Sequence, residues 1–238
     1  MNNNSVAAAL VSGVLVCAGL VGMGVTLGNA ALDYREYERT VRVKGLAERE
    51  LPADVVIWPI QFAEASNDLT SLHVALENGA GKVRQFLLGK GIEASEISLA
   101  APAITDKSAQ SYGGPPSEFR YTGTQTVTVY SSQIQRVRDA MSALSELGKQ
   151  GVAVTGGDYQ SQTEYLFTRL NDIKPEMIEE ATTKAREVAE KFAADSNSRL
   201  GKIKTASQGQ FTISDRDRNN PHIKNIRVVS TVEYYLSD

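Results

Sequence analysis

The chain has 238 residues, of which 42% are apolar and 22% charged, and its formal net charge is −3. This balance is ordinary for a globular protein with room for one large or two small domains. The mild acidity argues against nucleic acid as a partner, because phosphate binding needs a basic face. The single cysteine, Cys17, excludes a disulfide within the chain and also Cys-based zinc and redox motifs.

The N-terminal segment has no charged side chain before Asp33. Between residues 6 and 27 nearly every side chain is apolar or small, and a helix of about 20 residues crosses the hydrocarbon core of a membrane. We expect residues 1–5 to be a short tail and residues 6–30 to be a signal anchor or a signal peptide. The length of the run favours a retained anchor, whereas the small residues that end at Ala30 also fit cleavage. The protein is therefore expected to be anchored in an inner membrane with a periplasmic domain, or periplasmic after cleavage.

Strands and a helix are predicted along the first part of the remaining chain. Residues 40–50 alternate as a strand with one wet face, and residues 55–62 form a second strand. Pro59 should place this second strand at a sheet edge or at a bulge, because proline cannot donate to a ladder. Asp68 is expected to cap a helix that ends near Gly89. Next we expect a strand over residues 97–105, a polar loop over residues 107–117 and a further strand over residues 119–130.

A shorter helix and another strand follow. The helix is expected to start at Ser132 and to end at Gly148 or Gly151. Residues 152–167 form the next predicted strand.

The longest helix is expected between Asp172, as its cap, and about Ser198. Pro175 should lie in its first turn, where a missing N–H costs nothing. Its apolar stripe is expected to comprise Met177, Ile178, Ala181, Ala185, Val188 and Phe192. Two strands, 202–213 and 226–236, complete the chain.

This order interleaves helices with pairs of strands. It predicts an α+β fold with an antiparallel or mixed sheet, helices packed on that sheet, and the N-terminal hydrophobic helix preceding it. No linker that would separate independent domains is visible, so residues 31–238 are expected to form a single domain.

Three stretches resemble the SIMPL-domain (DUF541) family. Residues 40–50 (Thr-Val-Arg-Val-Lys-Gly-Leu-Ala-Glu-Arg-Glu), with Pro-Ala-Asp at 52–54, look like its opening strand and turn. Residues 185–193 (Ala-Arg-Glu-Val-Ala-Glu-Lys-Phe-Ala), which run into Leu-Gly-Lys-Ile at 200–203, resemble its long helix and the following strand. The alternation of Val, Ser, Val and Tyr over residues 228–234 matches its last strand, so the resemblance covers roughly residues 39–238.

The resemblance implies a SIMPL-like domain from residue 31 onward. The family comprises bacterial periplasmic or outer-envelope proteins, among them an immunogenic periplasmic protein of Brucella-type bacteria, and a mammalian kinase-binding signalling protein. It implies assembly into a large ring-like homo-oligomer and a role linked to envelope or oxidative stress. It supplies no catalytic or binding residues, and this chain lacks the basic, clearly cleaved signal of other members.

The sequence shows no catalytic signature. The two histidines, His73 and His222, have no second His, Cys or paired carboxylate at ligand spacing. A nucleophile elbow and a phosphate-binding loop are missing from the sequence as well. We therefore expect no catalytic, cofactor-binding or metal-binding residues, no cofactor, and a protein that is not an enzyme.

Two other features are expected to be structural. Glu48 and Glu50 share a strand face and could act as an acid–base pair, but Arg42 and Lys44 lie on the same face and favour a neutralised wet surface. Trp58 is expected in the core, since large aromatic side chains are mostly buried; an exposed Trp58 would indicate a partner surface.

The first functional hypothesis is a non-enzymatic envelope protein that works by self-association and by contacts with other envelope proteins. The long amphipathic helix and the strand edges would supply its surfaces. The alternative is a domain that binds a small molecule or peptide in a groove of the sheet, in a pocket ringed by Tyr112, Tyr121 or Tyr159. An enzyme, the third hypothesis, would show a buried carboxylate with a perturbed pKa in such a pocket.

Overall fold

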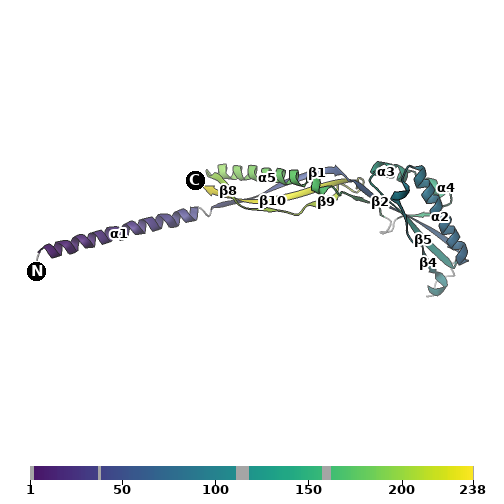
Figure 1. Ribbon diagram of the computed structural model, residues 1–238, viewed down its shortest axis with the longest axis horizontal. Coiled ribbons are helices and arrows are strands. Elements are labelled where there is room, and N and C mark those ends of the chain that lie inside the picture. Colours follow the sequence, from purple (N-terminus) through teal and green to yellow (C-terminus); the bar gives the residue numbers. More distant parts are fainter. Residues whose placement is uncertain (1–2, 37–38, 111–117, 157–161, 238) are drawn as a thin grey trace. The chain divides into compact units, whose positions relative to one another are not determined.

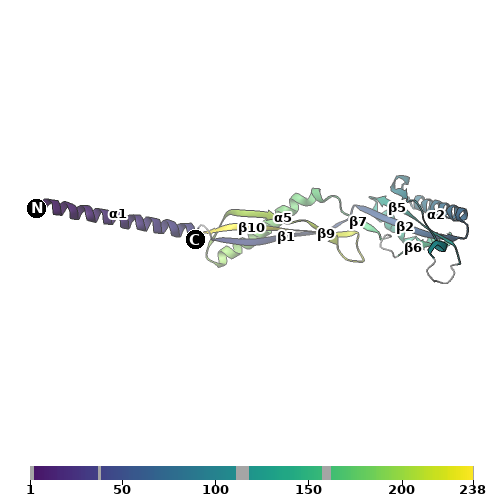
Figure 2. The ribbon, with the colours of Figure 1, turned by 90° about the horizontal axis from the view of Figure 1, so that it is seen from below.

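The computed structural model describes residues 3–36, 39–110, 118–156 and 162–237 (Figures 1 and 2). The first of two units comprises Met1–Glu48, Lys174–Thr212 and Arg227–Asp238, and the second comprises Arg49–Ile173 and Ile213–Ile226. The expectation of a single domain over residues 31–238 stays a prediction.

The chain starts with the long helix α1 (Asn3–Glu36). The side chains of residues 12–30 are all exposed. Among the described residues, Ser12–Ala30 is the one helical stretch long and apolar enough to cross a membrane. The expected N-terminal hydrophobic helix is therefore present.

A sheet covered by one helix forms the rest of the first unit. The strands β1 (Thr40–Pro52), β10 (Ile223–Ser237) and β8 (Arg199–Gln208) lie side by side in that order. Strand β9 (Thr212–Asp215), which belongs to the second unit except for Thr212, also pairs with β10. The pair β10–β8 is antiparallel. Helix α5 (Leu170–Asp195) runs along these strands in both views (Figures 1 and 2).

Small residues bring α5 unusually close to the sheet. The buried residues of this helix recur every fourth position: Met177, Ala181, Ala185, Ala189 and Ala193. Opposite them, a Cβ placed on Gly45 would lie 1.8 Å from the Ala181 carbonyl oxygen and 2.5 Å from the Ala185 amide nitrogen. Only glycine fits at this point of β1, so helix and strand meet backbone to backbone.

The predicted stripe and start of α5 need correction. Val188 is 37% exposed and Phe192 is 56% exposed, although both were expected in the stripe. The alanines at i, i+4 spacing take the buried line and turn these two larger residues to the flank. The helix also begins at Leu170, so Pro175 lies beyond its first turn and Asp172 lies inside it.

The second unit is built on another antiparallel sheet, with strand order β3-β5-β2-β6. Its strands are β2 (Val55–Ser66), β3 (Ile97–Leu99), β4 (Ala103–Asp106), β5 (Tyr121–Ser131), β6 (Val154–Thr155) and β7 (Glu164–Leu166). Strand β4 pairs with β5, and β7 pairs with β2. The α+β fold with antiparallel sheets is confirmed, and the strands form two sheets rather than one.

Helices cover the core of this unit. They are α2 (Leu69–Gly89), α3 (Ile134–Ser142) and α4 (Ser145–Lys149). The short turn η1 (Ala94–Glu96) lies between α2 and β3, and η2 (Lys107–Gln110) follows β4. Val56, Trp58, Ile60 and Phe62 alternate along β2 and pack with apolar residues of α2 such as Leu76. The helix expected from Ser132 onward is thus two short helices. The strand expected over 152–167 is β6 and β7, with residues 157–161 outside the described part.

Asp68 caps α2 as expected, because its carboxylate accepts a hydrogen bond from the Ser71 amide at 2.8 Å. The helix ends at Gly89, also as expected.

Pro59 lies in an interior strand, against the expectation of an edge or a bulge. On one side β2 pairs with β5 without interruption, and on the other it pairs with β7 at residues 55–57 and with β6 at residues 61–62. Ala63 donates its N–H to the Ala153 carbonyl on this second side. Pro59, four residues earlier, faces the same side, because backbone groups alternate along a strand. Its missing N–H therefore falls in the gap between β7 and β6.

Candidate functional site

Both histidines are in the second unit. His73 is exposed on α2. His222 is half-buried, with its ring 6.1 Å from that of Tyr165. Burial lowers the pKa of His222, and the nearby Arg138 and Arg216 lower it further. Among the described residues, no three His, Cys, Asp or Glu side chains come together as a metal site requires.

Glu48 and Glu50 are both on the exposed side of β1, as are Arg42 and Lys44. The carboxylate of Glu50 lies 3.9 Å from the Arg216 guanidinium. Both carboxylates lie on the solvent-exposed face of β1, which agrees with the charge-neutralised surface predicted for them.

The aromatic residues divide between core and surface. Trp58 is 5% exposed, so it belongs to the core as expected. Tyr121 is half-buried, and the guanidinium carbon of Arg120 lies 4.8 Å from the centre of its ring. Tyr112 and Tyr159, the other two residues of the expected tyrosine-ringed pocket, lie outside the described residues.

The first unit combines an alanine-rich core with several exposed large apolar side chains. Its buried apolar residues are Val43, Ala47, Met177, Ala181, Ala185, Ala189, Ala193, Val228, Val232 and Tyr234. Its exposed large apolar residues outside α1 are Leu46, Val188, Phe192, Ile203 and Tyr235. Two of these, Val188 and Phe192, are four residues apart on α5 and are therefore neighbours on one helix face. We call this pair the α5 flank.

Strand β8 is the other exposed feature of the first unit. It pairs with β10 at the end of the strand order β1-β10-β8. Every residue of β8 is exposed except Leu200, which is half-buried. Ile203 lies opposite Tyr234, so it shares the sheet face on which Tyr234 packs against α5, yet it is 50% exposed. The helix thus leaves the β8 end of this face open.

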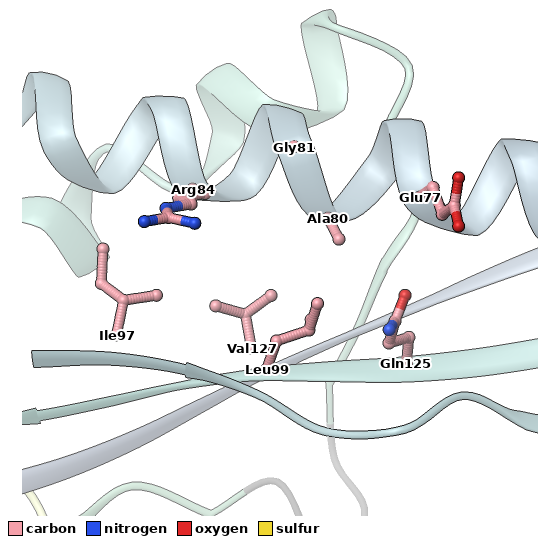
Figure 3. A pocket seen from close by; sticks show the side chains of 8 residues that line it. All are labelled: Glu77, Ala80, Gly81, Arg84, Ile97, Leu99, Gln125 and Val127. Atoms are coloured by element: carbon pink, nitrogen blue, oxygen red, sulfur yellow. The ribbon is translucent and has the colours of Figure 1, made fainter. Parts of the chain in front are cut away.

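A cavity of about 300 Å³ lies in the second unit, between α2 and the strands β3 and β5 (Figure 3). Helix α2 contributes Glu77, Ala80, Gly81 and Arg84 to the lining of this cavity. The strands contribute Ile97, Leu99, Gln125 and Val127. The volume is at the lower end of the range of small-molecule sites.

Gln125 is the buried polar residue of this cavity. It is 7% exposed, and its Nε2 donates a hydrogen bond to the Ala100 carbonyl at 3.0 Å. That bond fixes the orientation of the amide, because a carbonyl accepts only from the NH₂ group. The remaining atom, Oε1, is buried and has no hydrogen-bond partner within the part of the chain that the structure describes.

Sequence reasoning missed this cavity, although one signal was present. Gln125 has the same parity in its strand as the apolar Val127 and Val129, which are buried. A polar residue in an inward-facing position is uncommon and indicates a buried partner or a ligand. The residues of α2 that line the cavity form no motif, so only the fold brings them to Gln125.

The fold and these surfaces define an α+β protein with antiparallel sheets, helices packed on them, and an apolar N-terminal helix. A family model described as SIMPL, protein of unknown function (DUF541), matches residues 41–230. The chain belongs to the SIMPL (DUF541) family, and the resemblance seen in the sequence is confirmed. Among curated proteins, none matches this chain.

Proposed function

We propose that this chain is a non-enzymatic protein of the cell envelope that acts through self-association and contacts with other envelope proteins. The observation that carries the proposal is the α5 flank, where Phe192 and Val188 stay exposed beside a core built from alanines. Contiguous exposed apolar side chains mark interaction sites more often than isolated ones do. A link to envelope or oxidative stress is part of the proposal on the family resemblance alone.

The charges around the flank favour a second copy of the same chain as partner. Helix α5 carries the i,i+4 ion pairs Glu180–Lys184, at 2.6 Å, and Arg186–Glu190, at 3.3 Å. A surface that combines an apolar pair with charges of both signs can associate with its own copy across a two-fold axis. The apolar flank at the centre and mixed charges around it have the composition of an interface core and rim.

Sedimentation velocity on residues 33–238 tests this proposal. Phe192→Glu places a charge in the centre of the interface and should shift the oligomer to monomers, since an unpaired buried charge is strongly unfavourable. Val74→Glu is the matched control, because Val74 is 52% exposed on helix α2 of the second unit. An oligomer that persists unchanged in Phe192→Glu, or that is lost equally in both variants, contradicts the proposal.

The N-terminal helix supports a place at the membrane, and we propose that residues 6–30 act as a retained anchor with the rest of the chain in the periplasm. Its apolar stretch is longer than the 7–15 residues of a typical cleavable signal. Mass spectrometry of the mature protein distinguishes the alternatives. Residue 1 retained in a membrane fraction fits an anchor, whereas a mature chain that begins at Ala31 fits a cleaved signal. An intact chain in the cytosolic fraction contradicts export.

A further inference from the structure

The cavity between α2 and the strands β3 and β5 has the chemistry of a binding site. Gln125 Oε1, which points toward α2 (Figure 3), is buried without a hydrogen-bond partner among the described residues. Leaving such an acceptor unpaired costs free energy, and a ligand that donates a hydrogen bond there removes that cost. The unpaired Gln125 Oε1 therefore favours a ligand that carries an N–H or O–H donor.

Opposite charges lie at the two ends of this cavity. Glu77 and Arg84 project from α2 at opposite ends, and the Gln125 amide lies at the Glu77 end (Figure 3). Neither charge makes an ion pair or hydrogen bond with another residue in the described ranges. They are seven positions apart on the helix, which corresponds to about 10 Å along the axis. A ligand with a cationic end and an anionic end at this separation would engage both.

The cavity between the charges is lined mainly by apolar residues. Val127 and Leu99 come from the strands, and Ala80 and Gly81 come from the helix (Figure 3). Leu99 is 58% exposed and thus has apolar surface left to cover. A Cβ added to Gly81 would meet no atom within 4 Å, so the helix leaves free space there. The middle of the ligand is therefore apolar and slender.

We propose that this cavity binds a short apolar peptide with free termini. The ammonium group lies at Glu77 and donates to Gln125 Oε1, and the carboxylate lies at Arg84. An extended chain spans about 3.3–3.6 Å per residue, so three residues cover the distance between the two charges. The cavity volume of about 300 Å³ limits the side chains to small apolar ones such as alanine. This inference concerns the second unit and does not depend on self-association.

Isothermal titration calorimetry on the full chain in lipid nanodiscs, with tri-alanine as the probe, tests the proposal. Wild type should bind tri-alanine, whereas N-acetyl-tri-alanine amide, which lacks both charges, should bind about tenfold more weakly or worse. Arg84→Gln, an exposed position that leaves the core intact, should weaken tri-alanine binding by a similar factor, and Gln125→Met should weaken it as well.

Gly81→Leu fills the free space and should abolish binding. Gly89→Leu is its matched control, since Gly89 also lies on α2 with no atom within 4 Å of its Cβ position but does not line the cavity. Circular dichroism checks that each variant is folded. The proposal is overturned if wild type gives no binding heat with tri-alanine. Equal binding of the capped peptide, or unchanged binding in Arg84→Gln, would overturn it too.

Discussion

Asp54 shows what a single carboxylate does in the turn after β1. Its oxygens accept hydrogen bonds from the Thr168 amide at 2.9 Å and from the Arg169 amide at 3.1 Å, and the Arg169 Nε lies 3.2 Å away. Burial by itself raises the pKa of Asp54. The hydrogen bonds from Thr168 and Arg169 outweigh it and hold the pKa below the ordinary value of 3.8. The carboxylate thus ties two segments that lie more than a hundred positions apart in the sequence.

Replacing Asp54 by Asn should lower the free energy of unfolding at pH 7 by about 1–2 kcal/mol, because the amide cannot accept all these hydrogen bonds. A group whose pKa is lowered on folding stabilises the fold above its ordinary pKa, and this contribution is lost as the pH falls through the folded pKa. The difference between wild type and Asp54→Asn should therefore shrink as the pH falls below 3.8, the ordinary pKa of the group. Urea denaturation at pH 7 and pH 2.5 measures both values. An equal difference at the two pH values contradicts this account.

At the scale of elements, the contact between α5 and β1 depends on small residues on both partners. Ala181 and Ala185 on the helix meet Gly45 on the strand, where a Cβ would overlap backbone atoms. Backbone atoms cannot move aside as the end of a flexible side chain can. The pair therefore fixes how near the helix lies to the sheet.

Gly45→Ala should destabilise the chain by about 2–3 kcal/mol, because overpacking forces backbone shifts. Gly148→Ala is the control: Gly148 lies in α4, and its Cβ position has no atom within 4 Å. That change should stabilise slightly, as Ala is the better helix former. Chemical denaturation of the two variants checks the contrast. A Gly45→Ala protein as stable as wild type would show that the close approach does not exist in solution.

The alternating strands and capped helices could be predicted from the sequence because local pattern decides them. Strand β1 and the Asp68-capped helix α2 follow period-two and period-3.6 patterns that need no tertiary information. The buried face of α5 could not be predicted in this way. Hydropathy predicts that Val188 and Phe192 are buried in preference to alanine. In the structure the alanines of α5 are buried instead, because the helix packs against the backbone of β1 at Gly45.

The candidate site was still less accessible to sequence reasoning. Gln125 lies in a strand otherwise rich in Thr and Val, and Arg84 lies in a helix about forty residues earlier. No fixed spacing joins them, because only the packing of α2 on β3 and β5 creates the cavity. Pro59 illustrates the same limit, since its tolerance in an interior strand depends on a gap between two short neighbours.

At the scale of the whole chain, the protein has an N-terminal helix long and apolar enough to cross a membrane and an exposed apolar flank on α5. In the function proposed above, the helix holds the chain at a membrane and the flank is the surface through which copies associate. Burying the exposed parts of Phe192 and Val188 contributes only about 1–2 kcal/mol for each copy. A stable assembly therefore needs further surface, and the exposed strand β8 of the same unit offers it.

Multi-angle light scattering coupled to size-exclusion chromatography of residues 33–238 tests self-association most directly. The account predicts a molar mass that is an integral multiple of the mass of one chain and that falls to a single chain in Phe192→Glu. A wild-type protein that stays a monomer at high concentration would contradict it.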